Sequence, residues 1–342
     1  MKRHRFIVCG TLSIVVGFVV ASNAGQATPP RPPDPAAVRS NRAVDYRAPE
    51  GIDFRTARIT SEGVQLHAEL FSPTALAGKP LPTIIMAHGW GGTAAVFRRD
   101  AVDLARAGYL VLVFDYRGWG ESDARLVLTK PSQIVPTPGK NQTFTAEVTE
   151  VREYVDPLEQ TTDWFNVINW AVGEPAVDKN RIGIRGSSYS GGHVFYVAAH
   201  DSRVTAAVSQ AGAFDSRWVM ADEAARQQAF DEGTKRAHGA TYPAPRAVVV
   251  GSLIGAPIRE KLMLYAPIEQ AARVKDTAVL FIVAEKEELF SNADNAKLAH
   301  DRMAGAKKKY VSVPGTHYAV YREQRDAVVK LAVDWFNEHL TK

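Results

Sequence analysis

Short runs of consecutive apolar residues recur along the chain from residue 54 onward. Because these runs lack alternation, they are typical of strands buried on both faces of a parallel sheet. Residues 54–71 differ, since apolar and polar positions alternate there around a Ser61-Glu62-Gly63 turn, which predicts two antiparallel strands at an edge of the sheet. The uninterrupted runs are 82–87, 109–115, 181–185, 204–208, 278–284 and 309–313.

Helical periodicity occupies the stretches between these runs. Apolar side chains recur there at the three- and four-residue spacing that places them on one face of an α-helix. Strands that alternate with such helices predict an α/β fold in which helices cover both faces of a mostly parallel sheet. The expected helices are 94–108, 156–172, 295–303 and 322–340.

Two segments interrupt the alternation of strand and helix. Residues 126–147 are rich in Pro, Thr and Gly, and residues 214–276 contain one expected helix, 218–234, followed by an irregular stretch. Loops of this length in a compact domain usually carry lid or binding elements. We therefore interpret residues 214–276 as a small cap insertion over the active site.

Residues 1–27 have the pattern of a secretory signal. Basic residues precede an apolar run, and small residues suit cleavage after Ala24 or Ala27. An uncleaved membrane anchor is the alternative, because the apolar run nearly reaches spanning length. We expect cleavage, and therefore a secreted or periplasmic protein without stable membrane association.

The mature chain is expected to begin with a stiff segment. Residues 28–50 open with the proline-rich sequence TPPRPPDP, which is typical of an extended linker, and residues 51–342 then form one domain. The only cysteine, Cys9, lies in the signal, so the mature chain has no disulfide and no cysteine nucleophile. Cleavage removes Lys2, Arg3 and Arg5 without any acid, which lowers the net charge from +4 to about +1 and gives no reason to expect a nucleic-acid partner.

The sharpest chemical signal is the sequence GSSYSGG, which directly follows the expected strand 181–185. A serine nucleophile on a strained strand-to-helix turn needs small residues two places before and after it. Gly186 and Ser190 meet this need around Ser188, which we predict as the nucleophile. Ser190, with Gly192 two places later, is the alternative, but it lies farther from the end of the strand.

A glycine-rich loop, HGWGG at residues 88–92, follows the first expected parallel strand. Glycines at this position let a backbone N–H point into the site, and an oxyanion hole needs two such donors. We assign the donors to the main-chain N–H groups of Trp90 and Tyr189. His88 is interpreted as a structural residue.

A serine hydroxyl needs a base, and the base needs an orienting acid. His317 lies on the loop after the last expected strand, where the chain order Ser, acid, His places the base. Glu287, shortly after the strand 278–284, is the predicted acid. Glu288 beside it and Asp215, one strand earlier, remain alternatives.

These motifs resemble those of the α/β-hydrolase superfamily, and more narrowly of its dienelactone-hydrolase and X-Pro-dipeptidyl-peptidase-like branch, which includes cocaine-esterase-type enzymes. The resemblance runs from residue 54 to the C-terminus. It implies an eight-stranded, mostly parallel sheet and hydrolysis through an acyl-enzyme. The glutamate-rich acid turn departs from the commoner Asp form. The matching stretches are HGWGG, FDYRGWGES, GSSYSGG, AEKEEL and PGTHY.

The leading functional hypothesis is hydrolysis of carboxylic esters of small molecules by Ser188, His317 and Glu287, with no metal or organic cofactor. A serine exopeptidase or amidase acting on short peptides is the nearest alternative. It would need an acidic anchor for the substrate amine, for which Asp222 and Glu223 are candidates. A non-catalytic binding protein on the same fold is less favoured, because the serine, the histidine and the glycine loops are all intact.

Overall fold

The computed structural model of the chain describes residues 42–239, 242–250 and 253–340. The predicted signal at residues 1–27 and most of the predicted linker therefore lie outside the described residues. The described residues comprise most of the predicted domain and the short segment that leads into it.

The segment before the first strand packs against the body of the protein. Ala43 is buried, and the ring of Tyr46 lies edge-on to the ring of Phe54 at a centroid distance of 4.9 Å. The guanidinium of Arg98 lies over the Tyr46 ring, 4.8 Å from its centroid. The packed part of the chain consequently begins some residues before Gly51.

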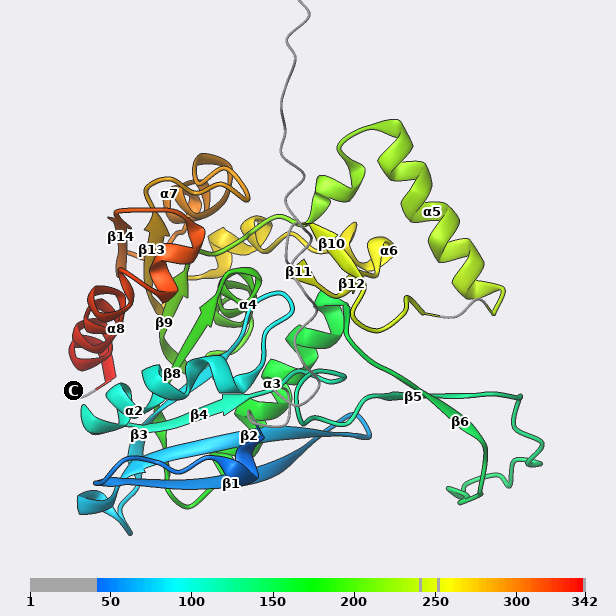
Figure 1. Cartoon of the computed structure of the whole chain (residues 1–342), viewed down its shortest axis with the longest axis horizontal. Coiled ribbons are helices and arrows are strands. Elements are labelled where there is room, and N and C mark those ends of the chain that lie inside the picture. Colours follow the sequence, from blue (N-terminus) through cyan, green and yellow to red (C-terminus); the bar gives the residue numbers. More distant parts are fainter. Residues whose placement is uncertain (1–41, 240–241, 251–252, 341–342) are drawn as a thin grey trace, which may run out of the picture.

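An eight-stranded sheet forms the centre of the fold (Figure 1). The first three strands in spatial order pair antiparallel, and every later pair of neighbours is parallel. All the strands expected from the sequence are present, which confirms the predicted mostly parallel sheet. In spatial order they are β1 (Ile52–Ser61), β2 (Val64–Pro73), β4 (Leu110–Phe114), β3 (Leu81–Ala87), β8 (Val177–Ser187), β9 (Val204–Gln210), β13 (Ala278–Ala284) and β14 (Lys308–Val313).

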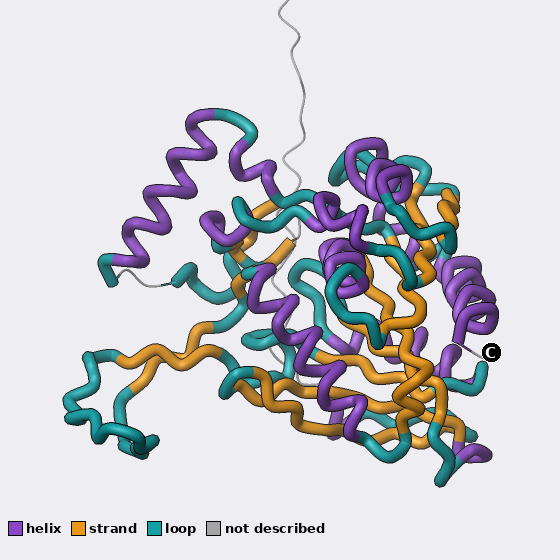
Figure 2. Tube along the Cα trace, turned by 180° about the vertical axis from the view of Figure 1, so that it is seen from behind, coloured by secondary structure: helices purple, strands orange, loops and turns teal. Residues whose placement is uncertain are grey.

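Helices cover both faces of this sheet, as predicted (Figures 1 and 2). Helices α2 (Arg98–Arg106) and α8 (Arg325–Leu340) pack together on one face, and α3 (Pro157–Gly173) and α4 (Tyr189–Ala198) pack on the other. Each face has its own apolar core, because the strands are buried on both sides. Asp156 caps the N-terminus of α3, because its carboxylate accepts hydrogen bonds from N–H groups of the first turn.

Shorter helical turns join these elements. Two of them open helices that the sequence analysis expected to be regular throughout: a 3₁₀ turn precedes α2, and a π-helical turn precedes α7 (Leu298–Arg302). The turns are η1 (Ala43–Asp45), η2 (Thr74–Leu76), η3 (Ala94–Phe97), η4 (Arg217–Met220), η5 (Pro267–Arg273), η6 (Ala293–Lys297) and η7 (His317–Tyr321).

The segment expected to be irregular at residues 126–147 has paired ends. Strands β5 (Arg125–Leu128) and β6 (Val148–Val151) form an antiparallel hairpin, the arm, that projects from the body (Figures 1 and 2). Its apolar side chains are largely exposed, with Leu126 63% exposed. The paired stretch is too short for its alternation to be recognised in the sequence.

The segment interpreted as a cap, residues 214–276, leaves the sheet after β9 and returns at β13. Its helix α5 (Glu223–Ala237) begins later than expected, since a 3₁₀ turn takes the first residues and the carboxylate of Asp222 then caps the helix. Beyond it lie β10 (Val248–Val250), β11 (Leu253–Ile254), β12 (Ala256–Pro257) and α6 (Arg259–Leu262), and β12 pairs with β7 (Tyr154–Val155).

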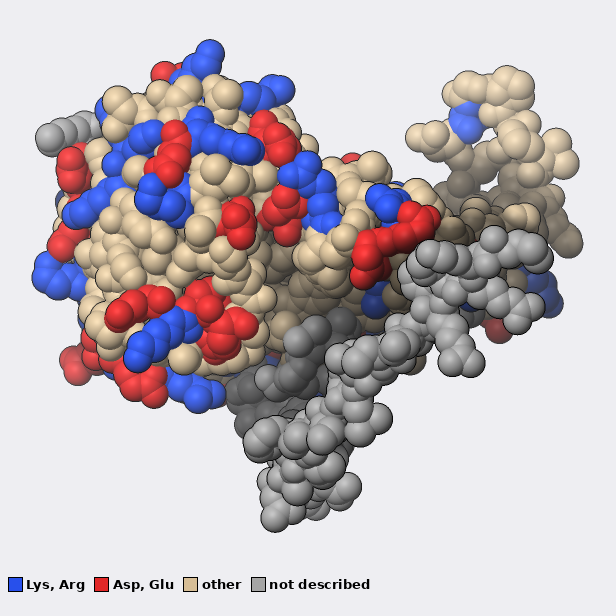
Figure 3. Space-filling view, turned by 90° about the horizontal axis from the view of Figure 1, so that it is seen from above, with Lys and Arg blue, Asp and Glu red and all other residues tan. Residues whose placement is uncertain are grey.

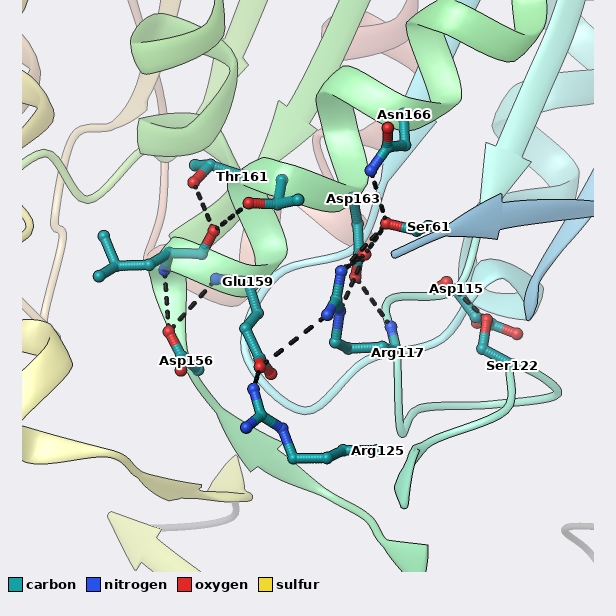
Figure 4. Close-up of polar contacts among 12 residues, drawn as sticks. Ser61, Asp115, Arg117, Ser122, Arg125, Asp156, Glu159, Thr161, Asp163 and Asn166 are labelled. Atoms are coloured by element: carbon teal, nitrogen blue, oxygen red, sulfur yellow. Dashed lines mark hydrogen bonds and ion pairs between the residues drawn. The ribbon is translucent and has the colours of Figure 1, made fainter. Parts of the chain in front are cut away.

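A buried ionic cluster fastens the turn after β4 to helix α3 (Figure 4). The guanidinium of Arg117 donates to the Asp163 carboxylate at 2.6 and 2.9 Å and to the hydroxyl of Ser61, which itself donates to Asp163. Arg125, at the base of the arm, forms an ion pair with Glu159 one turn away on α3. The pairing offsets the cost of burying these charges and holds β1, the turn and α3 in one arrangement.

Candidate active site

Ser188 occupies the tight turn between β8 and α4. Its φ of +56° and ψ of −122° are unfavourable for a residue with a side chain, which is the strain that a nucleophile turn carries. A Cβ on Gly186 would lie 2.1 Å from the carbonyl oxygen of Ser190, so the turn requires glycine there. The N–H of Ser188 donates to the carbonyl of Gln210 at 2.8 Å, which ties the turn to the neighbouring strand.

The alternative nucleophile faces away from this site. Ser190 is fully buried, and its hydroxyl shares a hydrogen bond of 2.7 Å with the hydroxyl of Tyr116. The indole N–H of Trp164 donates to the same tyrosine oxygen. Ser190 therefore belongs to the packing beneath α4.

His317 is brought beside Ser188 from the far end of the chain. Its Nε2 lies 3.1 Å from Ser188 Oγ, and its Nδ1 lies 2.8 and 2.9 Å from the two carboxylate oxygens of Glu287. Because a carboxylate accepts, the proton on Nδ1 points to Glu287 and leaves Nε2 free to accept from the serine hydroxyl. The side chains of His317 and Glu287 are 3% and 1% exposed, so this contact is shielded from water.

The other two candidates for the acid have different partners. Glu288 Oε2 accepts a 2.7 Å hydrogen bond from the backbone N–H of His317 and so holds the main chain of the base. Asp215 forms a two-oxygen pair with the guanidinium of Arg217. Of the three carboxylates considered as the acid, only that of Glu287 contacts the imidazole of His317 among the described residues.

Aromatic rings surround the imidazole. Phe290 and Tyr318 lie edge-on to His317 at centroid distances of 5.7 and 5.4 Å, and Tyr321 is tilted at 6.1 Å. The hydroxyl of Ser187 donates to the Tyr321 oxygen at 2.6 Å, which joins the loop of His317 to the strand end beside the nucleophile. Burial raises the pKa of Tyr321, so its hydroxyl stays neutral. No sequence pattern pointed to Ser187 or Tyr321.

The glycine loop after β3 lies directly against Ser188, the predicted nucleophile. A Cβ on Gly89 would stand 2.7 Å from both Ser187 O and Ser188 Cβ, so only glycine allows this approach. Trp90 follows it in the chain, and Tyr189 is the first residue of α4. The first N–H groups of a helix have no acceptor within the helix, and the positive end of its dipole lies there. Of the two predicted oxyanion donors, Tyr189 is adjacent to Ser188 in the chain, and Trp90 is adjacent to Gly89, the residue in close contact with Ser188.

His88 packs under the loop instead of facing Ser188. Its Nδ1–H donates to Gly89 O at 2.8 Å, and its ring lies edge-on to Tyr116 and Trp119. Burial lowers the pKa of His88 to about 4, although the bond to Gly89 acts in the opposite direction. The ring is neutral near pH 7, as suits the structural role assigned from the sequence.

A second buried histidine lies on the inner side of α4. His193 Nε2–H donates to the side-chain oxygen of Gln160 at 3.0 Å, and its Nδ1 accepts from the Tyr265 hydroxyl at 2.6 Å. Burial lowers the pKa of His193 to about 3. These hydrogen bonds tie α4 to α3 and to Tyr265 in the segment interpreted as a cap.

The two candidate anchors for a substrate amine have local partners. Asp222 accepts from the backbone N–H of Ala225 at 2.8 Å as the cap of α5, and Glu223 pairs with Arg226 one turn along the helix. Both are exposed. Their contacts are those of an ordinary helix N-terminus.

The described part of the chain has neither a cluster of metal ligands nor a membrane-spanning helix. Within it, no group of three or more His, Cys, Asp or Glu side chains could hold a metal ion, and no helix is long and apolar enough to cross a membrane. On the face seen in Figure 3, Lys and Arg side chains are interspersed with Asp and Glu.

Comparison with known proteins relates this site to a family of hydrolases. Residues 62–248, more than half of the chain, match the family described as X-Pro dipeptidyl-peptidase (S15 family). The matched segment begins in the turn between the first two strands and includes the glycine loop, Ser188 and α5. His317 and Glu287 lie beyond it.

Relatives of similar length exist as sequences and as solved structures. An uncharacterized 31.7 kDa protein in the traX-finO intergenic region of Escherichia coli is 27% identical over an alignment of 289 residues that covers 76% of this chain and 91% of that protein. The crystal structure of the hypothetical protein PA2218 from Pseudomonas aeruginosa has a TM-score of 0.69 at 19% identity, covering 86% of this chain and 96% of that one. Acetyl xylan esterase 1 from Thermoanaerobacterium sp. JW/SL YS485 has a TM-score of 0.56 at 19% identity, covering 86% of each chain.

Proposed function

The chain belongs to the X-Pro dipeptidyl-peptidase (S15) family within the α/β-hydrolase superfamily, and we propose that it is a serine hydrolase that cleaves carboxylic esters through an acyl-enzyme. The observation that carries the proposal is the continuous chain of contacts from Ser188 Oγ through both ring nitrogens of His317 to the carboxylate of Glu287. A serine hydroxyl becomes nucleophilic only when such a base can take its proton.

The proposed reaction has two halves. His317 Nε2 takes the proton of Ser188 Oγ as this oxygen attacks the acyl carbon, and the N–H groups of Trp90 and Tyr189 bind the developing oxyanion. The imidazolium, stabilised by Glu287, then gives the proton to the departing alcohol, which leaves the acyl group on Ser188. The same imidazole takes a proton from a water molecule as the water attacks this ester, and it then returns the proton to Ser188 Oγ as the acyl–oxygen bond breaks and the acid is released.

Esters are favoured over peptides by the surroundings of the site. An exopeptidase that removes residues from a free N-terminus needs a carboxylate to bind the substrate ammonium. The candidates for that carboxylate, Asp222 and Glu223, serve the N-terminus of α5 and pair with its own residues. One similar solved structure is that of an esterase, the acetyl xylan esterase named above.

The second candidate function is that of a serine exopeptidase or amidase, and the family match itself favours it. The same three residues would perform the chemistry, because amide and ester hydrolysis share the tetrahedral intermediate. The two functions differ in substrate preference, which a direct comparison measures.

The test begins with a fluorophosphonate probe, which labels only an activated serine. We expect labelling of the wild-type protein and of Ser190→Ala, and none of Ser188→Ala. Wild-type protein that does not label, or Ser188→Ala that does, contradicts the assignment of the nucleophile. A panel of short acyl p-nitrophenyl esters and X-Pro p-nitroanilides then compares kcat/KM, and dominant amide hydrolysis would favour the exopeptidase.

Secretion is part of the proposal and is supported by the signal pattern of residues 1–27. The protein exported from the cell is expected to begin at Gly25 or Thr28, which N-terminal sequencing measures. An exported protein that begins at Met1 contradicts cleavage.

A further inference from the structure

The cap, residues 214–276, contacts the residues that carry the predicted oxyanion donors. The indole N–H of Trp90 donates to the carbonyl oxygen of Gly255 at 2.8 Å. Gly255 lies between the cap strands β11 and β12, far from Trp90 in the chain. The side chain of the residue whose backbone N–H would bind the oxyanion is therefore held by the cap.

The other donor residue is held in the same way. The hydroxyl of Tyr189 shares a 2.8 Å hydrogen bond with the hydroxyl of Ser216, which lies at the beginning of the cap. Both groups are buried. Burial raises the pKa of Tyr189, so the hydroxyl remains neutral and available for this bond.

The two donor residues also contact each other. The indole of Trp90 and the ring of Tyr189 meet edge-on at a centroid distance of 5.2 Å. Such a geometry is favourable for aromatic rings. A displacement of either side chain by the cap would be passed to the other, and from there to the backbone that carries it.

Glycines make the contact with the cap close. A Cβ on Gly91 would lie 2.5 Å from the carbonyl oxygen of Ile254, so β11 passes directly over the glycine loop. Gly255 has a φ of +110°, and a Cβ there would lie 2.6 Å from the ring of Trp119. The carbonyl that accepts from Trp90 is thus fixed in direction by a conformation that favours glycine.

We infer that Trp90 is a positioning residue through which the cap sets the oxyanion hole: its indole bond to Gly255 and its ring contact with Tyr189 keep both backbone donors aimed at the reacting carbonyl. The inference rests on the proposed function, since it concerns the oxyanion of acyl transfer. Donors of this kind act only when they point at the place where charge develops, and small displacements are costly to the rate.

The test is Trp90→Phe, which keeps an aromatic ring but removes the bond to Gly255. We expect kcat for a short acyl ester to fall by about 10- to 100-fold, with KM changed by less than about twofold, because the loss is confined to the transition state. Binding of an alkylboronic acid, which forms a tetrahedral adduct on Ser188, should weaken by the same factor as kcat/KM. The matched control is Trp335→Phe, whose indole N–H donates to the carbonyl of Ala278 under α8, away from the site. Its kcat should equal that of the wild type.

A second variant approaches the contact from the cap. Gly255→Ala should displace the carbonyl and give the same loss of kcat and of boronate affinity while Trp90 is intact. Thermal unfolding of each variant separates this from instability, because a purely structural role would lower Tm and leave the kcat of folded protein unchanged.

The outcomes are distinct. The inference is overturned if Trp90→Phe keeps the wild-type kcat and boronate affinity, or if Trp335→Phe loses as much as Trp90→Phe. In either case the proposed function stands as long as the wild-type protein hydrolyses esters and Ser188→Ala does not. Wild-type protein without ester hydrolysis or labelling overturns both.

Discussion

At the scale of single residues, neighbours of identical chemistry perform different tasks. Glu287 and Glu288 are adjacent carboxylates on one turn, yet the first contacts the imidazole of His317 and the second its backbone N–H. Ser188 and Ser190 are separated in the same manner, one at the tip of the turn and one in the core beneath it. In both pairs, the direction of the side chain decides the task.

The acid turn gives the first residue-scale prediction. Glu287→Gln should lower kcat by about 10³- to 10⁴-fold, because the amide no longer stabilises the imidazolium and can select the wrong tautomer. Glu288→Gln keeps an oxygen that accepts from the backbone of His317, so kcat should fall by less than about tenfold. Ester hydrolysis by the two variants, purified in parallel, measures this, and the reverse ranking would assign the acid to Glu288.

At the scale of elements, the arm and the Arg117 cluster have opposite relations to the body of the protein. The arm is a hairpin whose tip, residues 129–147, is largely exposed. Figure 4 shows the other extreme, with Arg117, Asp163 and Ser61 enclosed between the turn after β4 and α3. A long insertion on the surface is tolerated, whereas a buried ion pair that loses one partner is strongly destabilising.

The element-scale prediction compares these two features. Replacing residues 129–147 by a two-residue Asn-Gly turn should leave the free energy of unfolding of the body unchanged within about 0.5 kcal/mol, since no core contact is lost. Asp163→Ala should lower it by about 3–5 kcal/mol, because the buried charge of Arg117 loses its closest partner and keeps only the longer contact with Glu159 at 3.9 Å. Urea unfolding followed by tryptophan fluorescence measures both. A large loss on excision of the arm tip would show that the tip supports the body.

At the scale of the whole molecule, the buried histidines His88 and His193 couple stability to pH. Their pKa values are lowered by burial, to about 4 for His88 and about 3 for His193. In the unfolded chain a histidine titrates near 6.5, so between pH 6.5 and about 4 the unfolded state binds more protons than the folded state. Acidification through this range therefore destabilises the fold. Asp115 opposes the effect below pH 6, because burial raises its pKa to about 6.

We expect the free energy of unfolding to fall on going from pH 7 to pH 5. Each histidine contributes a loss of about 2 kcal/mol over this range, and the proton taken up by Asp115 offsets part of the total. His193→Gln should flatten the dependence, while the exposed residue His200 offers a control, since His200→Gln should leave it unchanged. Urea unfolding at both pH values measures the difference. Equal stability at pH 7 and pH 5 in the wild type would contradict the buried neutral state of these rings.

Local patterns were sufficient for the architecture of the sheet. A run of apolar residues can be buried on both sides only in the middle of a layered fold, so the parallel strands β3, β4, β8, β9, β13 and β14 could be located along the chain from its sequence. The turn at Ser188 was equally accessible, because the small residues around it are a local steric requirement. The arm was missed, since its paired ends are too short to show alternation.

Only the tertiary structure decided the pairings between distant parts of the chain. Which of the carboxylates of Glu287, Glu288 and Asp215 contacts the imidazole of His317 depends on side-chain directions across elements that are far apart in sequence. The same is true of the contacts that Trp90 and Tyr189 make with residues 214–276. The physical reason is range: periodicity and small-residue spacing act over a few neighbouring positions, whereas a contact of about 3 Å between remote side chains is set by the packing of the whole sheet and its helices.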